Sequence, residues 1–241
     1  MTAREKDRPA YVRYSFVYPI HNEAERLHNL AGIIDFFRTR LSEPFEVLLV
    51  NNGSTDGTSA LARGLVLSYP EVRLIEIERV GRGNALRDGF LAARGDLVGV
   101  SAIDRAWDER FFVEAAGLLG PGGVDVVYGP KTHPGSDVHR PLLRGLVSTL
   151  SRAFLSLLFA VPLQDTQCIK LFVKRRCPFI QELGPYNYFA ETEFFLRARR
   201  HGLKATAIPV SVRDTNRGSK VRPSSLGRFL FEAAHFRFSN K

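Results

Sequence analysis

The feature that most constrains the fold is a regular alternation, up to about residue 130, between short apolar runs and longer segments with helical periodicity. The apolar runs are rich in Val, Ile and aromatic residues, which is typical of buried strands, and they span residues 14–18, 47–50, 72–77, 97–102 and 124–128. Amphipathic segments lie between them at residues 23–40, 57–68, 84–93 and 108–119. This spacing predicts βαβ units, and therefore an α/β fold with a mostly parallel central sheet flanked by helices.

The rhythm changes after residue 130. A loop signal at residues 133–136 precedes the remaining predicted elements, which are helices at 141–160, 189–201 and 224–238 and strands at 170–173 and 205–208. Asp56 and Asp108 stand where helix N-caps belong, directly before amphipathic segments. Because the sequence has no internal repeat and no low-complexity tract, we predict a single domain over residues 1–241, with halves at about 12–130 and about 131–241.

Composition narrows the class of protein. The 241 residues include only two cysteines, Cys168 and Cys177, which excludes a disulfide framework and favours a reduced, cytosolic setting. The net charge of +9 favours a polyanionic partner, such as nucleic acid, an anionic membrane face or a phosphorylated substrate. No nucleic-acid-binding motif accompanies that charge, so nucleic acid is not an expected partner. No secretory signal and no run of about 20 uncharged apolar residues is found, so a membrane-spanning helix is not expected either.

Four polar turns, three of which contain glycine, adjoin the strands of the first half. They are residues 19–23 (PIHNE), 51–58 (NNGSTDGT), 81–86 (GRGNAL) and 93–96 (ARGD). We expect all four at one edge of the parallel sheet, where backbone amides and helix N-termini favour phosphate and ribose. Any one of them is an ordinary turn, but four in order predict a nucleotide site.

The order of these motifs resembles the inverting glycosyltransferases of family 2, which have the GT-A fold. Residues 165–172 (DTQCIKLF) resemble the D-T-Q-C-G-F-K-L-F stretch of dolichyl-phosphate glucosyltransferases. The P-V pair at 209–210 and the G-S-K-V stretch at 218–221 are similar to motifs of polyprenyl-phosphate mannosyl- and glucosyltransferases. The resemblance covers roughly residues 12 to 225, and the D-T-Q-C block is its most specific part.

The resemblance implies transfer of a hexose, from UDP-glucose or GDP-mannose, to a polyprenyl phosphate by a peripheral protein at the cytoplasmic, inner face of the membrane. The first half would then bind the nucleotide sugar and the second half the acceptor. The residues implied to contact the nucleotide sugar are Pro19, His21, Glu23, Asn52, Ser54, Arg82, Gly83 and Asp104. Asn52 replaces the family's usual aspartate against the base, and Arg82 stands where a lysine is common.

The metal motif departs from the family pattern. Relatives carry D-x-D after the fourth strand to hold Mg²⁺ or Mn²⁺ on the diphosphate, and this chain has Ala102, Ile103 and Asp104 there. Asp104 is the implied metal ligand, although such cations prefer several oxygen ligands. Three interpretations stay open: a weakened metal site, metal-independent transfer with an arginine such as Arg105 neutralising the diphosphate, and a catalytically impaired relative.

The acceptor decides which catalytic residues are needed. A phosphate monoester is largely dianionic at neutral pH, so it needs orienting cations rather than a base, and Arg213, Arg217 and Lys220 fit that demand. A hydroxyl acceptor, such as a saccharide or a glycerol derivative, would need a general base, for which Glu191 or Glu193 is the implied residue. The implied catalytic residues are Asp104, Glu191, Arg217 and Lys220, and the implied acceptor contacts are Asp165, Gln167, Arg213, Arg217, Lys220 and Arg144. A non-catalytic nucleotide-binding protein is the third alternative.

The predicted helix at residues 141–160 carries an apolar stripe beside basic residues. Leu146, Leu150 and Phe154 follow an i, i+4 rhythm, while Arg144 and Arg152 share another face. This pattern suits a helix lying in the interface of an anionic leaflet, and it equally suits a helix that packs on a protein core.

Overall fold

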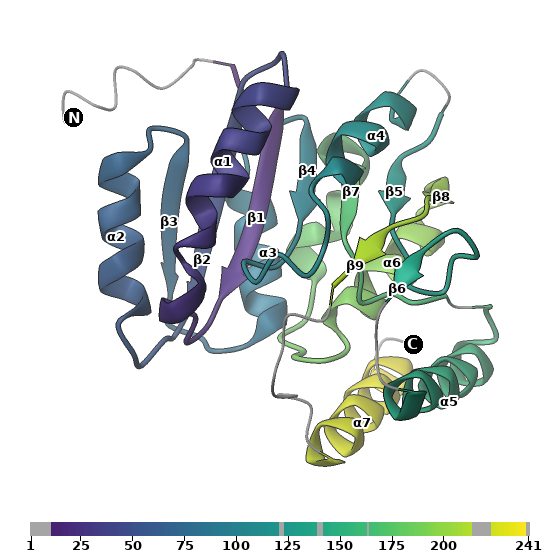
Figure 1. Cartoon of the computed structure of the whole chain (residues 1–241). Coiled ribbons are helices and arrows are strands. Elements are labelled where there is room, and N and C mark those ends of the chain that lie inside the picture. The colour runs from purple at the N-terminus through teal and green to yellow at the C-terminus, as the bar shows by residue number, and fades with distance from the viewer. Residues whose placement is uncertain (1–10, 121–122, 139–141, 163, 214–222, 240–241) are drawn as a thin grey trace.

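A computed structural model describes residues 11–120, 123–138, 142–162, 164–213 and 223–239, with side chains undescribed in 142–147 and 223–226. Seven strands form one sheet in the order β3-β2-β1-β4-β7-β5-β8 (Figure 1). The strands are β1 (Tyr14–Ile20), β2 (Phe45–Asn52), β3 (Val72–Ile77), β4 (Leu97–Val100), β5 (Val126–Tyr128), β7 (Lys170–Val173) and β8 (Ala205–Ala207). A separate two-stranded sheet pairs β6 (Asp137–Val138) with β9 (Ser211–Val212).

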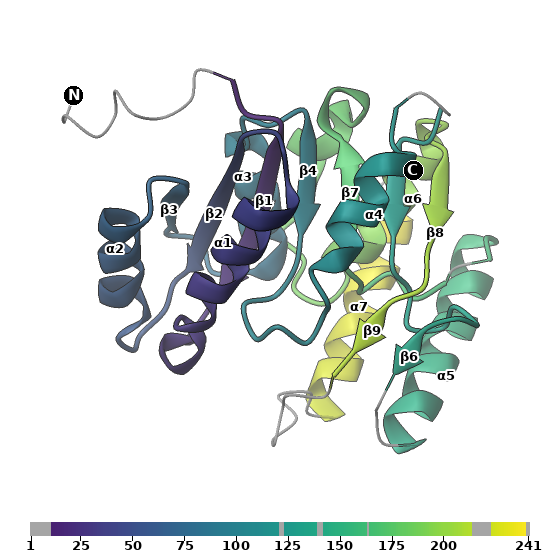
Figure 2. The ribbon, with the colours of Figure 1, turned by 45° about the horizontal axis from the view of Figure 1, so that its top comes forward.

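Helices cover both faces of the large sheet (Figures 1 and 2). The α-helices are α1 (Asn29–Arg40), α2 (Thr58–Ser68), α3 (Arg82–Ala92), α4 (Arg110–Leu118), α5 (Leu142–Phe159), α6 (Ala190–Arg200) and α7 (Pro223–Ser239). The 3₁₀ turns are η2 (Ala24–Arg26), η3 (Lys174–Arg176) and η4 (Pro178–Glu182). One face packs against α1, α2 and α4, and the other against α3 and α6. On the first face the rings of Phe16 and Phe37 stack with centroids 3.9 Å apart. The predicted fold class is confirmed.

Strand direction decides which loops meet. Strands β1, β2, β3 and β4 are parallel, whereas β7 runs antiparallel to both β4 and β5. Lys170, the first residue of β7, pairs with Val100 at the end of β4 and with Tyr128 at the end of β5. The segment before Lys170 therefore arrives at the same sheet edge as the loops that follow β1, β2 and β4.

The turn at residues 93–96 does not lie at this edge, so that expectation is wrong. The turn precedes β4, whose first residue Leu97 pairs with Tyr14 at the start of β1. It therefore lies at the amino edge of the sheet, where Asp96 accepts hydrogen bonds from Tyr11 and Arg13, both at 3.1 Å. The order of motifs along the sequence does not distinguish a turn that enters a strand from one that leaves it.

Two other sequence-based expectations have clear outcomes. Oδ1 of Asp56 and of Asp108 each accept the N–H of the first helical residue, two positions further on, both at 2.9 Å. The N-cap positions are Gly57 and Glu109, so each aspartate stands one residue before the N-cap, the position that the sequence predicts for it. The helix expected at 23–40 is instead the turn η2 followed by α1. The backbone N–H of Glu23 donates to the Thr58 hydroxyl at the start of α2, which ties this turn to the neighbouring loop.

Helices α5 and α7 pack against each other and against α6, at the lower end of the molecule in the view of Figure 1. Their buried residues Leu155, Phe229 and Phe236 contact Phe189 and Leu196 at the start and on the outer face of α6. Within the described residues, no helix combines the length and the apolar character needed to span a bilayer.

Candidate active site

Asn52 joins three segments at the carboxyl edge of the sheet. Its side-chain oxygen accepts the backbone N–H of Gly81 at 2.6 Å, and its backbone carbonyl lies 2.7 Å from Nδ1 of His21. Because a carbonyl only accepts, His21 carries a proton on Nδ1. Asn52 is buried, so the residue expected against the base also holds the loops around it in place.

Ser54 braces the loops after β1 and β2. Its hydroxyl accepts the backbone N–H of Asn22 at 3.0 Å and donates to Oδ1 of Asn51 at 2.6 Å. Asn22 has a φ of 52°, a left-handed conformation that asparagine tolerates. Pro19, the next-to-last residue of β1, is half-buried directly before this turn. The predicted donor-contact residues at the ends of β1 and β2 thus lie together.

The N-terminus of α3 approaches another loop so closely that only glycine fits. A Cβ on Gly83 would lie 2.4 Å from the carbonyl oxygen of Gly184 and 2.5 Å from that of Tyr186. The backbone N–H of Gly83 donates to Tyr186 at 2.7 Å, and that of Arg82 donates to Oδ1 of Asn187 at 2.9 Å. The segment that we call the clamp loop, residues 184–189, therefore fixes the start of α3.

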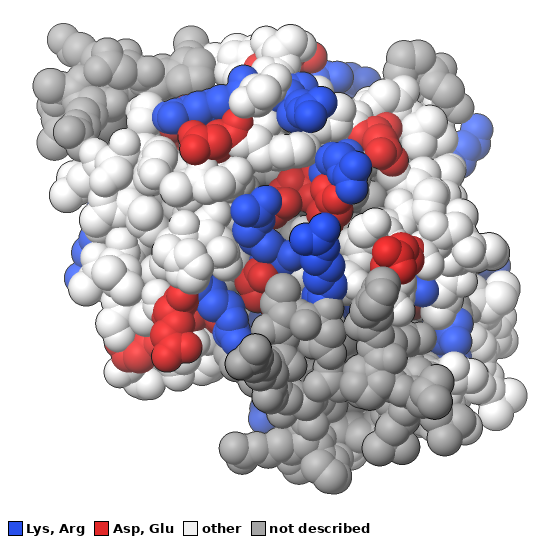
Figure 3. Space-filling model, viewed as in Figure 1, with Lys and Arg blue, Asp and Glu red and all other residues white. Residues whose placement is uncertain are grey.

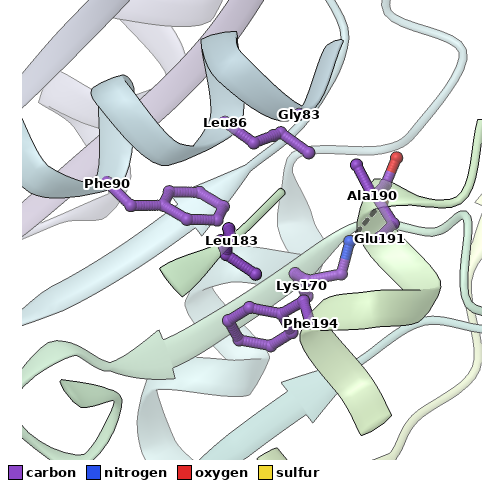
Figure 4. Close-up of a pocket in the computed structure, with 8 residues that line it drawn as sticks. All are labelled: Gly83, Leu86, Phe90, Lys170, Leu183, Ala190, Glu191 and Phe194. Atoms are coloured by element: carbon purple, nitrogen blue, oxygen red, sulfur yellow. Dashed lines mark hydrogen bonds and ion pairs between the residues drawn. The ribbon is translucent and has the colours of Figure 1, made fainter. Parts of the chain in front are cut away.

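Two cations hold Glu191, the second residue of α6. Arg82 donates to its Oε1 from Nε at 3.0 Å and from Nη2 at 2.6 Å, and the Lys170 ammonium donates to its Oε2 (Figure 4). Lys170 is 1% exposed and also donates to the carbonyl of Cys168 at 2.7 Å. Burial alone would raise the pKa of Glu191, but the charges of Lys170 and Arg82 lower it to about 2. The cavity beside Lys170 and Glu191 has a volume of about 10 Å³, room for no more than a water. We call this buried ion pair the buried brace.

The second acidic residue, Glu193, is used differently. Its Oε2 accepts the backbone N–H of Gly184 at 2.9 Å and its Oε1 accepts Nε of Arg197 at 2.8 Å. Burial raises its pKa, while Arg197 acts in the opposite direction. Glu193 thus anchors the clamp loop from α6, whereas Glu191 faces Arg82.

Asp104 lies after β4 as predicted, half-buried, with Oδ1 accepting the backbone N–H of Ala106 at 3.1 Å. Asn29 of α1 donates to the carbonyl of Ile103 at 3.0 Å and holds this segment against the loop after β1. Arg105, at a φ of 53°, forms an ion pair with Glu109 at 3.4 Å. Its guanidinium extends towards α1, where a Cβ on Gly32 would meet it at 3.0 Å.

The donor set for a metal is small. Among the described residues, no group of three or more His, Cys, Asp and Glu side chains is placed to hold an ion. Glu23 is engaged by Arg26 at 2.5 Å, and the pKa of Arg26 is raised by that hydrogen bond and by the nearby charge of Asp104. Asp104 therefore fits a divalent cation only as a single anchor, with the diphosphate and water supplying the other oxygens.

Lys131 contacts the D-T-Q-C block, residues 165–168. Lys131, three residues after β5, lies 3.7 Å from Oδ2 of Asp165 and 4.6 Å from the ring centroid of Trp107. It donates to the carbonyl of Gln167 at 3.2 Å, while Nε2 of Gln167 donates to the carbonyl of Tyr188 at 2.8 Å. The D-T-Q-C block therefore joins the loop after β5 to the clamp loop.

The predicted acceptor cations are only partly visible. The backbone N–H of Arg213, directly after β9, donates to the carbonyl of Ala106 at 2.9 Å, which brings Arg213 beside the Asp104 segment. Arg217, Lys220 and the side chain of Arg144 lie outside the described residues. Figure 3, viewed from the same side as Figure 1, shows Lys and Arg side chains next to acidic side chains near the middle of the molecule.

Lys131 and Lys170 were not expected from the sequence as site residues. The sequence signal for Lys131 is that it follows the apolar run at 124–128. Lys170 lies inside the 165–172 block that carries the family resemblance, but also inside a run that predicts a strand, which hid its role. Their roles depend on pairings across the sheet.

The pattern of the family described as "Glycosyl transferase family 2" matches residues 15–170. The chain belongs to glycosyl transferase family 2. Glycosyltransferase AglD of Haloferax volcanii, a similar protein, is 30% identical over 206 residues, which cover 83% of this chain. The chain spans only 33% of the length of AglD.

Two further relatives of this family-2 chain are dolichyl-phosphate beta-glucosyltransferases. That of Trichomonas vaginalis (ALG5A) is 28% identical over 232 residues, covering 90% of this chain and 71% of that protein. That of Saccharomyces cerevisiae is 27% identical over 238 residues, covering 86% and 68%.

The family-2 fold is also seen in solved structures. Glucosyl-3-phosphoglycerate synthase from Mycobacterium tuberculosis, in complex with Mn²⁺ and UDP-glucose, superposes with a TM-score of 0.67 at 21% identity. The match covers 98% of this chain and 81% of that one, so the two share a fold over nearly the whole of this chain.

Proposed function

We propose that this family-2 glycosyltransferase moves glucose from UDP-glucose, with inversion, to the phosphate of a polyprenyl phosphate at the cytoplasmic face of a membrane. Residues 12–130 bind the donor in this proposal, and residues 131–241 bind the acceptor. The observation that carries it is the meeting, at one sheet edge, of the α3 N-terminus, Asp104 and the D-T-Q-C block with its lysine. The two dolichyl-phosphate beta-glucosyltransferases support the acceptor and favour glucose over mannose.

On the donor side, the start of α3 offers an exposed cation at a helix N-terminus. The Arg82 side chain is 43% exposed, and Glu191 engages only its Nε and Nη2. A helix N-terminus and an oriented guanidinium both favour a diphosphate. Asn52, Ser54 and His21 shape the neighbouring loops for the nucleoside.

A divalent cation anchored by Asp104 would stabilise the leaving diphosphate. The M. tuberculosis synthase, crystallised with Mn²⁺ and UDP-glucose, shares the fold and supports testing Mn²⁺ first. With Ala102 in place of the first aspartate, we expect a site that forms only with the nucleotide present.

The acceptor chemistry follows from the charges. A phosphate oxygen of the acceptor attacks the anomeric carbon, the bond from that carbon to the diphosphate oxygen breaks, and UDP leaves. No proton is removed, because the attacking phosphate is already ionised. Lys131 and Arg213 are the described cations that would orient it, and Arg217 and Lys220 remain predicted contacts. Glu191, with a pKa of about 2, is a poor proton acceptor, and Glu193 has both carboxylate oxygens engaged, by the Gly184 N–H and by Arg197. Neither is placed as a free general base, which favours a phosphate over a hydroxyl acceptor.

The α5–α7 pair is the proposed membrane-facing surface. Leu150, Phe154 and Leu157 of α5 are exposed, as are Phe231 and Phe238 of α7. Arg152, Arg228 and Arg237 lie on the same helices. Apolar side chains beside cations suit a helix pair resting on an anionic leaflet.

The test is a transfer assay with labelled UDP-glucose or GDP-mannose, Mn²⁺ and vesicles containing a polyprenyl phosphate. We expect a β-linked glucosyl phosphate lipid from UDP-glucose, and none when the polyprenol without phosphate replaces the acceptor. The Asp104→Asn variant should lose transfer, while Asp35→Asn, at an exposed position on α1, serves as the matched control. Transfer to the free polyprenol, or from GDP-mannose alone, would contradict the proposal, as would no transfer by folded protein.

A further inference from the structure

One buried carboxylate connects α7 to the donor side of the molecule. Glu232 is 7% exposed, and its Oε2 accepts the backbone N–H groups of Asn187 at 3.1 Å, Tyr188 at 2.9 Å and Phe189 at 3.1 Å. Its Oε1 lies 3.2 Å from the N–H of Asn187. Three successive N–H groups aimed at one carboxylate are an anion-binding arrangement that is filled by a side chain from another helix.

This arrangement lies directly before the N-terminus of α6. Phe189, the residue before the helix, has no side chain able to accept a hydrogen bond, and α6 has no side-chain cap of its own. A negative charge near the N-terminus of a helix is favourable. Glu232 brings that charge from α7 and accepts the N–H of Phe189, and Arg228, one turn earlier on α7, lies 3.5 Å from its Oε1.

The amides that Glu232 holds belong to the clamp loop. Oδ1 of Asn187 accepts the N–H of Arg82, and the carbonyl of Tyr186 accepts the N–H of Gly83. Directly after the loop, Glu191 engages the Arg82 guanidinium. Glu232 therefore fixes both the backbone and the side-chain partner of Arg82 without touching Arg82 itself.

We propose that Glu232 is a positioning residue for the donor: from α7 it holds the clamp loop, and the clamp loop sets Arg82 and the α3 N-terminus for the donor diphosphate. This inference rests on the proposed function in that a nucleoside diphosphate binds at the start of α3. It adds that α7, which carries Phe231 on the proposed membrane-facing surface, also fixes the position of the proposed donor site through Glu232.

The test compares Glu232→Gln with Glu114→Gln, which removes the same charge from an exposed position on α4. Two quantities are measured on the full chain: the Kd of UDP with Mn²⁺ by calorimetry, and amide hydrogen exchange without ligand. We expect Glu232→Gln to raise the Kd roughly ten-fold and to speed exchange at Arg82 and Gly83, with the β1–β2 amides unchanged. Glu114→Gln should change neither quantity. In the transfer assay, Glu232→Gln should raise the KM for UDP-glucose more than it lowers kcat.

A Kd within two-fold of the wild type in folded Glu232→Gln overturns the proposal. So does faster exchange across the β1–β2 amides as well, because Glu232 would then be a general stability residue. If the wild-type chain binds no nucleotide, the proposed function fails, and unchanged exchange at Arg82 and Gly83 would then separately refute the role of Glu232 in holding the clamp loop.

Discussion

The side chains of the proposed donor side and those of the α5–α7 pair differ in how far the protein itself surrounds them. At the donor side, Asn52, Ser54 and Glu191 are each held by hydrogen bonds from neighbouring segments. On α5 and α7, large apolar side chains such as Leu157, 84% exposed, have little protein around them. The difference indicates that the proposed donor site is held in shape by the chain's own hydrogen bonds, whereas the α5–α7 pair presents an apolar surface suited to a membrane or a partner.

The largest effect is expected from breaking the buried brace of the donor side. Lys170→Met removes the cation that neutralises Glu191 inside the protein, leaving a buried carboxylate with one cation fewer. We expect a loss of about 3–5 kcal/mol in the free energy of unfolding, measured by urea denaturation. Lys204→Met, at an exposed position before β8, should change it by less than about 0.5 kcal/mol. Equal effects of the two substitutions would show that the Lys170–Glu191 pair is not a brace.

A smaller effect is expected where α3 meets the clamp loop. Gly83→Ala places a methyl group against two carbonyl oxygens, so we expect a cost of about 1–3 kcal/mol and weaker binding of UDP. Gly117→Ala in α4 is the matched control, because nothing lies within 4 Å of its Cβ position, and it should stabilise the helix by up to about 1 kcal/mol. Thermal unfolding and calorimetry measure both quantities. Unimpaired UDP binding by Gly83→Ala would separate the clamp loop from the donor site.

The smallest effect on stability is expected on the α5–α7 surface. The double variant Leu157→Ser and Phe231→Ser should shift the free energy of unfolding by less than about 0.5 kcal/mol, since both side chains are exposed. It should nevertheless reduce sedimentation with anionic vesicles several-fold, because apolar area no longer enters the interface. Leu67→Ser on α2, at a comparably exposed position, is the control. Unchanged vesicle binding by the double variant would remove this surface as the membrane contact.

The sequence predicted the strands, most helices and the polar turns after β1, β2 and β3, because these depend on local patterns. Apolar periodicity marks the strands, and the turns after β1 and β2 carry their own asparagines, serines and glycines. The sequence did not predict contacts between side chains that are far apart along the chain. Nothing local shows that Glu232 holds the clamp loop, that Lys170 is buried against Glu191, or that Asn52 holds Gly81. The D-x-D departure, in contrast, is visible in the sequence itself, as Ala102, Ile103 and Asp104.

The pairing of Tyr128 with Lys170 has a further consequence. The chain leaves the sheet after Tyr128 and rejoins it at Lys170 on the adjacent strand, so the excursion between them, which includes α5, begins and ends at neighbouring points. A segment with fixed, adjacent ends can be exchanged for one of different length at little cost in loop closure, because that cost grows only slowly with length. An exchange of residues 129–169 would therefore leave the pairing of β5 with β7 in place, although it would replace β6, which pairs with β9, and α5, which packs on α7. Under the proposed function, such an exchange is a direct way to alter which lipid is accepted.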